Sequence, residues 1–165
     1  MKLRTLSFLL VLCLVMGAFC GCVSKKTNDP IPTGDGIVFD LPEVAASAGE
    51  KVTLPILVNA DSNVAAVDFV VTYDSDLIAY NDFSAGSAFK LGIAEANEPE
   101  KGTVKITMAT LTSQKDAGRM CELTFTVTEN ATPCEIPVTL TCTDCCDYDT
   151  NKLAFTCQNG VIIIK

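Results

Sequence analysis

Residues 50–77 read EKVTLPILVNADSNVAAVDFVVTYDSDL, and this stretch decides the fold class. Apolar side chains occupy alternate positions in its first half, at Val52, Leu54, Ile56 and Val58. The same alternation returns in its second half, at Ala65, Val67, Phe69, Val71 and Tyr73. A period of two is typical of a strand with one buried face. We therefore predict two strands, over residues 52–58 and 65–73, that each turn one face to a hydrophobic core.

The second of these strands turns an unusual set of side chains outward. Its outward positions hold Ala66, Asp68, Val70 and Thr72, which are small and nearly uncharged. Asp68 is the single charge among them, and an acid in the middle of a strand is a poor choice for sheet stability. We interpret Asp68 as a residue that something outside the sheet uses.

The rest of the chain shows short strand patterns that end at Gly, Asn, Asp or Pro. We predict further strands over residues 37–41, 78–83, 89–94, 103–111, 121–128, 135–143 and 161–164. In the strand at 89–94 we place Phe89, Leu91 and Ile93 on the core side. About nine strands without a long helix predict an all-β fold, an antiparallel β-sandwich.

Two of these strands have outward positions that extend the surface around Asp68 if the strands are its neighbours. In residues 103–111 the outward side chains include Thr107, Ala109 and Leu111. In residues 135–143 they include Thr139 and Thr141. We therefore predict a flat outer face of small side chains around one carboxylate.

The N-terminal residues predict export and attachment to a membrane. Lys2 and Arg4 precede an apolar run over residues 6–19, as in a signal peptide. The run ends in Gly21 and Cys22, which resembles the cleavage box of bacterial lipoproteins, where the cysteine is lipidated. We predict a lipoprotein signal peptide over residues 1–21, a lipidated tether over 22–36 and one folded domain over 37–165. The domain would lie on the outer face of a bacterial membrane; ordinary signal cleavage without lipidation is the alternative.

Charge and composition exclude several function classes. The chain has 20 Asp and Glu against 12 Lys and Arg, a net charge of −8, which disfavours nucleic acid as a partner. It has no histidine, so nucleophilic sites that need imidazole are absent. Acidic residues gather at Glu95, Glu98 and Glu100 and again at Asp144, Asp147 and Asp149. A glycosidase needs two acids across a cleft, and we interpret both clusters as solvated loops, so no enzyme is predicted.

Two kinds of ligand remain as alternatives. Asp144, Asp147 and Asp149 are weak candidates for calcium, because hard cations take several oxygens from one irregular loop. The loop lacks the EF-hand pattern, and we predict no cofactor. A carbohydrate-binding module is the other alternative, but the chain has no Trp and 3 Tyr to serve as aromatic platforms.

Cysteines are frequent for a chain of this length. Of its 9 cysteines, the predicted domain holds Cys121, Cys134, Cys142, Cys145, Cys146 and Cys157. In an exported protein these are disulfide candidates, and six cysteines allow 15 connectivities that the sequence leaves open. Strand parity predicts that Cys121 and Cys142 point into the core, whereas the other four cysteines lie nearer the ends of their strands. A zinc site made of Cys142, Cys145, Cys146 and Cys157 is the alternative.

The stretch VTLPILVNADSNVAAVDFVVTYDSDLI resembles the second to fourth strands of cohesin domains. The family pattern D-F-x-x-x-Y-D is present here at residues 68–74. The resemblance continues more weakly through the predicted domain and implies a jelly-roll sandwich. Cohesins are non-catalytic modules that bind dockerin modules in cellulosome-type assemblies. The resemblance therefore implies a monomeric adaptor whose partner is a dockerin-bearing protein, with calcium in the dockerin.

The family uses one flat sheet face for this interaction. At the place of Asp68 it has an aspartate that accepts hydrogen bonds from dockerin hydroxyls. The predicted partner-binding residues are Ala66, Asp68, Val70, Thr107, Ala109, Leu111, Thr139 and Thr141. Two residues depart from the pattern, because Ala66 stands where the family has asparagine and Thr110 where it often has an acid. These departures favour another dockerin class or a more apolar interface. A carbohydrate-binding or structural surface lipoprotein is the alternative function.

Overall fold

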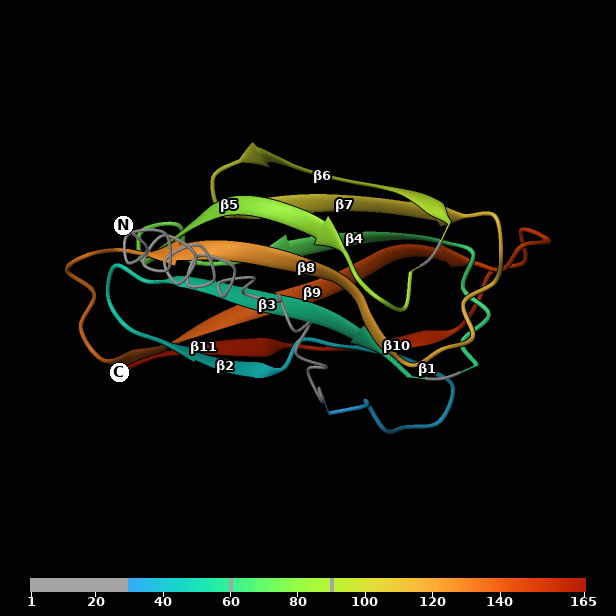
Figure 1. The fold of residues 1–165 in the computed structure, drawn as a ribbon, viewed down its shortest axis with the longest axis horizontal. Coiled ribbons are helices and arrows are strands. Elements are labelled where there is room, and N and C mark those ends of the chain that lie inside the picture. The colour runs from blue at the N-terminus through green and yellow to red at the C-terminus, as the bar shows by residue number, and fades with distance from the viewer. Residues whose placement is uncertain (1–29, 60, 90) are drawn as a thin grey trace, which may run out of the picture.

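The alternation in residues 50–77 produces two strands, β3 (Lys51–Val58) and β4 (Ala66–Thr72), and they lie in different sheets. The computed structural model describes residues 30–59, 61–89 and 91–165. Figure 1 shows these residues as two stacked β-sheets, and none of them is in a helix. The predicted all-β sandwich is therefore confirmed.

Each sheet has strands from both ends of the chain. The five-stranded sheet has the order β10 (Phe155–Gln158), β1 (Ile37–Asp40), β3, β8 (Gly118–Val127) and β5 (Ile78–Ala85). The six-stranded sheet has the order β2 (Glu43–Ala46), β11 (Gly160–Ile164), β9 (Cys134–Cys146), β4, β7 (Thr103–Thr110) and β6 (Gly92–Glu100). Neighbouring strands are antiparallel, except that β1 and β10 and also β2 and β11 are parallel. The result is a jelly-roll sandwich with eleven described strands instead of about nine.

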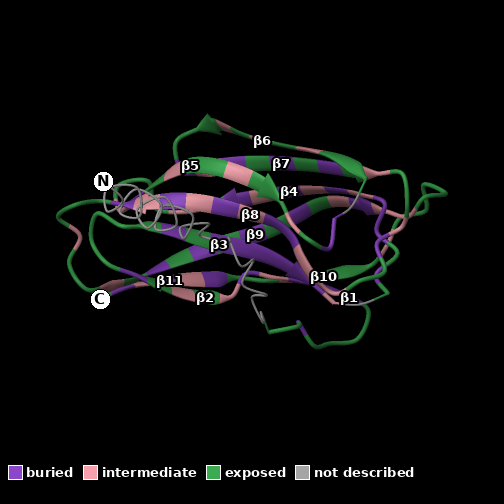
Figure 2. Ribbon diagram, viewed as in Figure 1, coloured by how far each residue is buried: buried purple, intermediate pink, exposed green. Residues whose placement is uncertain are grey.

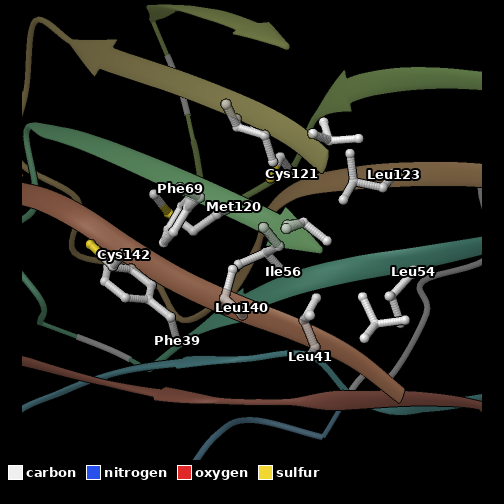
Figure 3. Close-up of a cluster of buried hydrophobic side chains, with 14 of the residues drawn as sticks. Phe39, Leu41, Leu54, Ile56, Phe69, Met120, Cys121, Leu123, Leu140 and Cys142 are labelled. Carbon is white, nitrogen blue, oxygen red and sulfur yellow. The ribbon is translucent and has the colours of Figure 1, made fainter. Parts of the chain in front are cut away.

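The core lies between the two sheets, where the predicted inward side chains meet. Figure 2 shows buried and exposed residues alternating along most strands. The rings of Phe39 and Phe69 meet edge to face, with centroids 4.8 Å apart. Figure 3 shows the two rings with other fully buried side chains around them. Full burial of one such side chain contributes about 1.5–3 kcal/mol, so the alternation in the sequence stabilises the sandwich.

The two strands that the sequence analysis missed, β2 and β10, come from segments that change sheets. The chain passes from β1 to β2 through Leu41 and Pro42, and from β10 to β11 through Asn159. These crossings touch, because the Leu41 amide donates to the Gln158 carbonyl at 3.1 Å. A Cβ on Gly160 would lie 2.7 Å from the Leu41 Cβ, so the crossing needs glycine there.

The strand predicted over residues 89–94 is wrong in position and in facing. The strand in this region is β6, and Leu91 and Ile93 are 77% and 71% exposed instead of buried. Leu91 has a positive φ of 54°, which interrupts the parity between Phe89 and Ile93. The Glu95 to Glu100 segment is an edge strand and not a loop. An edge position tolerates its charges and Pro99, because one side of the strand needs no hydrogen-bonding partner.

The predicted signal peptide, Cys22 and the first part of the tether lie outside the described residues. Within the described part of the chain, no helix is long and apolar enough to cross a membrane.

Candidate functional site

The register of the six-stranded sheet places Asp68 in a row of polar side chains. We call the side chains of β9, β4, β7 and β6 that point away from the core the outer face. Asp68 pairs with Thr107 of β7 on one side and with Asp144 of β9 on the other. Thr107 pairs in turn with Glu95 of β6. These four residues form an acidic row across four strands.

An apolar row lies directly beside the acidic row. It consists of Ile93, Ala109, Ala66 and Cys146, which pair in that order across β6, β7, β4 and β9. Leu91 and Leu111 extend it beyond the ends of β6 and β7, and Leu111 is 78% exposed. Leu91, Ile93, Ala109 and Leu111 line an open hollow of about 470 Å³. This end of the outer face is therefore apolar and accessible.

The outer face continues on the other side of the acidic row with small and polar side chains. Asn97, Lys105, Val70 and Thr141 form the next row. Thr103, Thr72 and Thr139 follow. All the predicted partner-binding residues except Leu111 therefore lie together on one face, and Leu111 lies just beyond the end of β7. Their placement is confirmed, and their role in binding stays a prediction.

Asp68 lies half-buried in the middle of this face. Among the described residues, none gives its carboxylate a side-chain hydrogen bond; the Thr143 hydroxyl donates to its backbone carbonyl at 3.3 Å. The register of β4 and β9 shifts between Asp68 and Phe69, so β9 has a β-bulge opposite Asp68. The bulge makes Asp144 the cross-strand partner of Asp68, so two acidic residues occupy neighbouring positions on this face.

Lys152 balances part of this negative charge. Its ammonium pairs with the Asp144 carboxylate, and the two side chains are 72% and 46% exposed. Their hydrogen bond lowers the pKa of Asp144 and raises that of Lys152, which Asp68 also raises by its charge. The Asp68 carboxylate thus remains available to donors from outside the chain.

Tyr73 and Glu98 hold the edge strand β6 near this face. The Tyr73 hydroxyl donates to the Glu98 carboxylate, which also accepts the Gly102 amide at 3.0 Å. The Tyr80 amide donates to the Tyr73 hydroxyl at 3.3 Å. Burial and the hydrogen bond to Glu98 raise the pKa of Tyr73 to about 12. Glu98 therefore has a structural partner, and Tyr73 is not an exposed aromatic platform.

The calcium alternative does not fit the arrangement of its three carboxylates. Asp144 pairs with Lys152, and Asp147 accepts hydrogen bonds from the amide and side chain of Asn151 at 2.8 and 3.0 Å. Across residues 30–59, 61–89 and 91–165, no three Cys, Asp or Glu side chains are grouped so that they could hold a metal ion. The same finding applies to the zinc alternative at the four cysteines.

The six cysteines of the domain all have free thiols in the structure. Cys121 and Cys142 are buried, as their strand parity predicts. Cys145 lies near the end of β9, as predicted, and the bulge in β9 turns it inward, so that it is 2% exposed. Disulfide formation by these cysteines stays a prediction.

The sequence analysis missed several residues of the outer face, namely Leu91, Ile93, Glu95, Asp144, Cys146 and Lys152. For Leu91, Ile93 and Glu95 the cause is the misplaced strand in that region. A signal was present, because Ile93, Glu95 and Asn97 alternate with Ala94 and Ala96. For Asp144 and Cys146 the sequence carries no signal of the bulge. Lys152 reaches the face only because β9 and its following turn bring it back beside Asp144.

The comparisons with known proteins agree on one domain type. The family model for the cohesin domain matches residues 37–164. No curated protein sequence gives a significant match. Among solved structures, the chain is similar to one in the type I cohesin–dockerin complex Coh-OlpA–Doc918 from Clostridium thermocellum. The identity is 19%, the TM-score is 0.73, and the match covers 79% of this chain and 100% of the other.

Two further structures are similar to the same extent. The sixth cohesin of scaffoldin B from Acetivibrio cellulolyticus, in complex with the Cel5 dockerin, is 20% identical with a TM-score of 0.71, over 79% of this chain and 99% of the other. A non-cellulosomal cohesin from the hyperthermophilic archaeon Archaeoglobus fulgidus is 18% identical, with a TM-score of 0.71. The match covers 79% of this chain and 91% of the other. At these identities the structural matches show the shared fold.

Proposed function

Because the chain belongs to the cohesin family, we propose that it is a non-catalytic adaptor that binds a dockerin-bearing protein through its outer face. Several of the similar structures were solved as cohesin–dockerin complexes. The observation that carries the proposal is Asp68, a carboxylate in mid-strand on a flat face without a side-chain partner among the described residues. An unpaired carboxylate in the middle of β4 lowers the stability of the sheet. Its presence is explained if a binding partner supplies the hydrogen-bond donors.

The shape of the outer face supports the same function. Its rows consist largely of Ala, Val and Thr, which allow another backbone to approach closely. A standard interface buries about 800 Å² per partner. Four neighbouring strands offer a surface of that order. The acidic row would orient the partner through its hydroxyl or ammonium donors, and charge complementarity would speed association.

The apolar row supports a partner outside the most familiar dockerin class. Thr110 stands where the family often has an acid, and its hydroxyl donates to the Leu91 carbonyl at 3.4 Å. Ala66 stands where the family has asparagine and lies in the apolar row. The face therefore offers fewer polar groups around Asp68 and more apolar surface at Leu91, Ile93 and Leu111. We expect apolar side chains on the matching part of the dockerin.

The proposal includes a place for the domain at the cell surface. The predicted signal peptide and the lipidated Cys22 would anchor the chain, and the tether over residues 22–36 would give a reach of about 20 Å as a flexible coil. A fatty-acid label on the wild type that is lost in Cys22→Ser tests the anchor. Equal labelling of both proteins would contradict it.

Affinity capture tests the function itself. The chain is immobilised through its tether and exposed to secreted proteins of the source cell, once with calcium and once with a chelator. We expect calcium-dependent capture of proteins that carry dockerin modules, since calcium is expected in the dockerin. Failure of purified dockerins encoded by the same genome to bind in calcium would contradict the proposal.

A further inference from the structure

Two cysteines of β9 meet on the inner side of the sheet, directly beneath the acidic row. Cys142 and Cys145 are 8% and 2% exposed, and both belong to the hydrophobic core. Figure 3 shows the Cys142 sulfur inside the core, next to the ring of Phe39. Regular alternation places residues three positions apart on opposite faces of a strand. That both side chains point inward therefore needs a local cause.

The cause is the β-bulge in β9. β4 pairs Asp68 with Asp144 and Phe69 with Cys142, so Thr143 is the extra residue. Thr143 and Asp144 both lie on the outer side, and Cys145 turns back inward. The Cys142 thiol reaches across the bulge and donates to the Asp144 carbonyl at 3.2 Å. It lies close enough to the Cys145 thiol that each shifts the pKa of the other. The bulge thus brings two sulfur atoms together.

A third thiol lies beside this pair. Cys157 of β10 lies close enough to Cys142 that each influences the pKa of the other. It pairs with Phe39 in the register of β1 and β10, so it packs against the same part of the core. By contrast, Cys146 pairs with Ala66 and belongs to the outer face. Cys142 and Cys145 therefore form a close pair, Cys157 lies beside this pair, and Cys146 lies on the other side of the sheet.

We propose that Cys142 and Cys145 form a disulfide bond across the bulge of β9, with Cys157 placed to exchange with it. The proposal rests on the predicted export to an oxidising compartment and not on dockerin binding. Because both sulfur atoms are buried in the folded domain, the bond forms before the core closes. The disulfide would hold Thr143 and Asp144 on the outer side and so fix Asp144 beside Asp68.

The chemistry balances with a disulfide as the oxidant. The Cys145 thiolate attacks one sulfur of a small-molecule or protein disulfide, which leaves a mixed disulfide and one released thiol. Cys142 then loses its proton and attacks the Cys145 sulfur, which releases the second thiol. The two cysteines lose two protons and two electrons, and the oxidant is reduced to two thiols. The same balance holds if Cys142 makes the first attack and Cys145 the second.

Peptide mapping of the full chain tests the proposal. The protein is exported, purified without reductant, unfolded, treated with N-ethylmaleimide and digested with proteases that cut after Glu and before Asp. Cys142 is then the single cysteine of fragment 136–143, and fragment 144–146 holds Cys145 and Cys146. We expect these fragments to be joined, to carry one N-ethylmaleimide on Cys146, to weigh otherwise two hydrogen atoms less than the sum of the free thiols, and to separate on reduction.

Matched variants identify the cysteine in fragment 144–146. The link is expected to persist in Cys146→Ser and to be lost in Cys145→Ser. Should Cys145→Ser fail to fold, the wild type and Cys146→Ser decide the question. The proposal is overturned if fragment 136–143 carries N-ethylmaleimide in the wild type, if it is joined to the fragment of Cys157, or if Cys146→Ser removes the link.

Discussion

The two sheets of the sandwich turn chemically different surfaces away from the core. On the outer side of the five-stranded sheet, polar side chains satisfy one another: the Thr126 hydroxyl donates to Asn81 at 2.6 Å, and Arg119 pairs with Glu122. On the outer face of the six-stranded sheet, Asp68 has no side-chain hydrogen bond from any residue of the described part of the chain. Both surfaces belong to strands with the same alternation.

This difference shows what alternation alone does not reveal. Polar side chains that pair within the sheet stabilise it, and their hydrogen-bonding groups are already used by each other instead of by a partner. An unpaired carboxylate flanked by small and apolar residues costs stability and offers a partner an acceptor. This contrast supports our proposal that the six-stranded sheet carries the docking face.

The sharpest test removes the carboxylate at the centre of the outer face. Asp68→Ala is expected to weaken dockerin binding by about 2 kcal/mol, roughly thirtyfold, as loss of a hot-spot residue does. The variant should remain folded, because Asp68 has no side-chain partner to lose among the described residues. Isothermal titration calorimetry measures the affinity, and thermal unfolding checks the fold.

Thr53→Ala provides the matched control. Thr53 is exposed on β3 of the five-stranded sheet, where it pairs with Thr124. Its removal is expected to leave the affinity unchanged. If Thr53→Ala weakened binding as much as Asp68→Ala does, the docking role would belong to the other sheet.

The apolar end of the outer face should contribute less than Asp68. Leu111→Asp introduces a charge into the hollow next to Ile93 and Ala109, and we expect about tenfold weaker binding from the cost of burying it. Ile31→Asp changes a 61% exposed side chain that belongs to none of the four strands of this face and serves as the control. Equal affinities of Leu111→Asp and the wild type would remove the apolar row from the interface.

The Tyr73 hydroxyl should lose its proton at an unusually high pH, and it should stabilise the edge strand that carries Glu95. Because its pKa is raised to about 12 in the folded protein, its contribution to stability is complete below its usual pKa of 10.0 and is lost as the pH rises from there to about 12. Tyr73→Phe removes the hydrogen bond to Glu98, at a cost of about 1 kcal/mol. Ultraviolet absorbance during alkaline titration follows the tyrosinate, and urea unfolding measures the stability. A titration of Tyr73 near 10 would contradict this account.

The smallest effect concerns the exposed pair of Asp144 and Lys152. In the folded protein the hydrogen bond from Lys152 lowers the pKa of Asp144. The pair therefore adds stability above the usual pKa of 3.8, and this contribution is lost as the pH falls through the lower folded value. Lys152→Gln should return the pKa of Asp144 toward its usual range, as carboxyl carbon NMR would show. An unchanged Asp144 titration in this variant would mean that Lys152 does not hold the carboxylate in solution.

Strand alternation predicted most of the fold and the centre of the outer face. Ala66, Asp68 and Val70 lie where their parity places them, because a strand with one buried face has little freedom to slip. The same logic placed Thr107 and Ala109, and β7 proved to be the neighbour of β4. The resemblance of residues 68–74 to the cohesin pattern then indicated the family, which the match over residues 37–164 shows.

The parts that could not be predicted depend on breaks in alternation. The positive φ of Leu91 changes the facing of Ile93, and the bulge at Thr143 turns Cys145 inward. Neither break has a Gly or Pro at the position concerned, so no local signal marks it. The sheet switches at both ends of the chain depend on contact between Leu41 and Gly160, which are far apart in the sequence.

We propose that the outer face of the six-stranded sheet binds the dockerin and that the other sheet does not. Amide NMR of the isotopically labelled chain during titration with an unlabelled calcium-loaded dockerin tests this residue by residue. The account predicts that the signals of Asp68, Thr107, Ala109 and Thr141 shift or broaden, while those of Thr53, Thr124 and Thr126 stay in place. Changes confined to β3, β5 and β8 would contradict it.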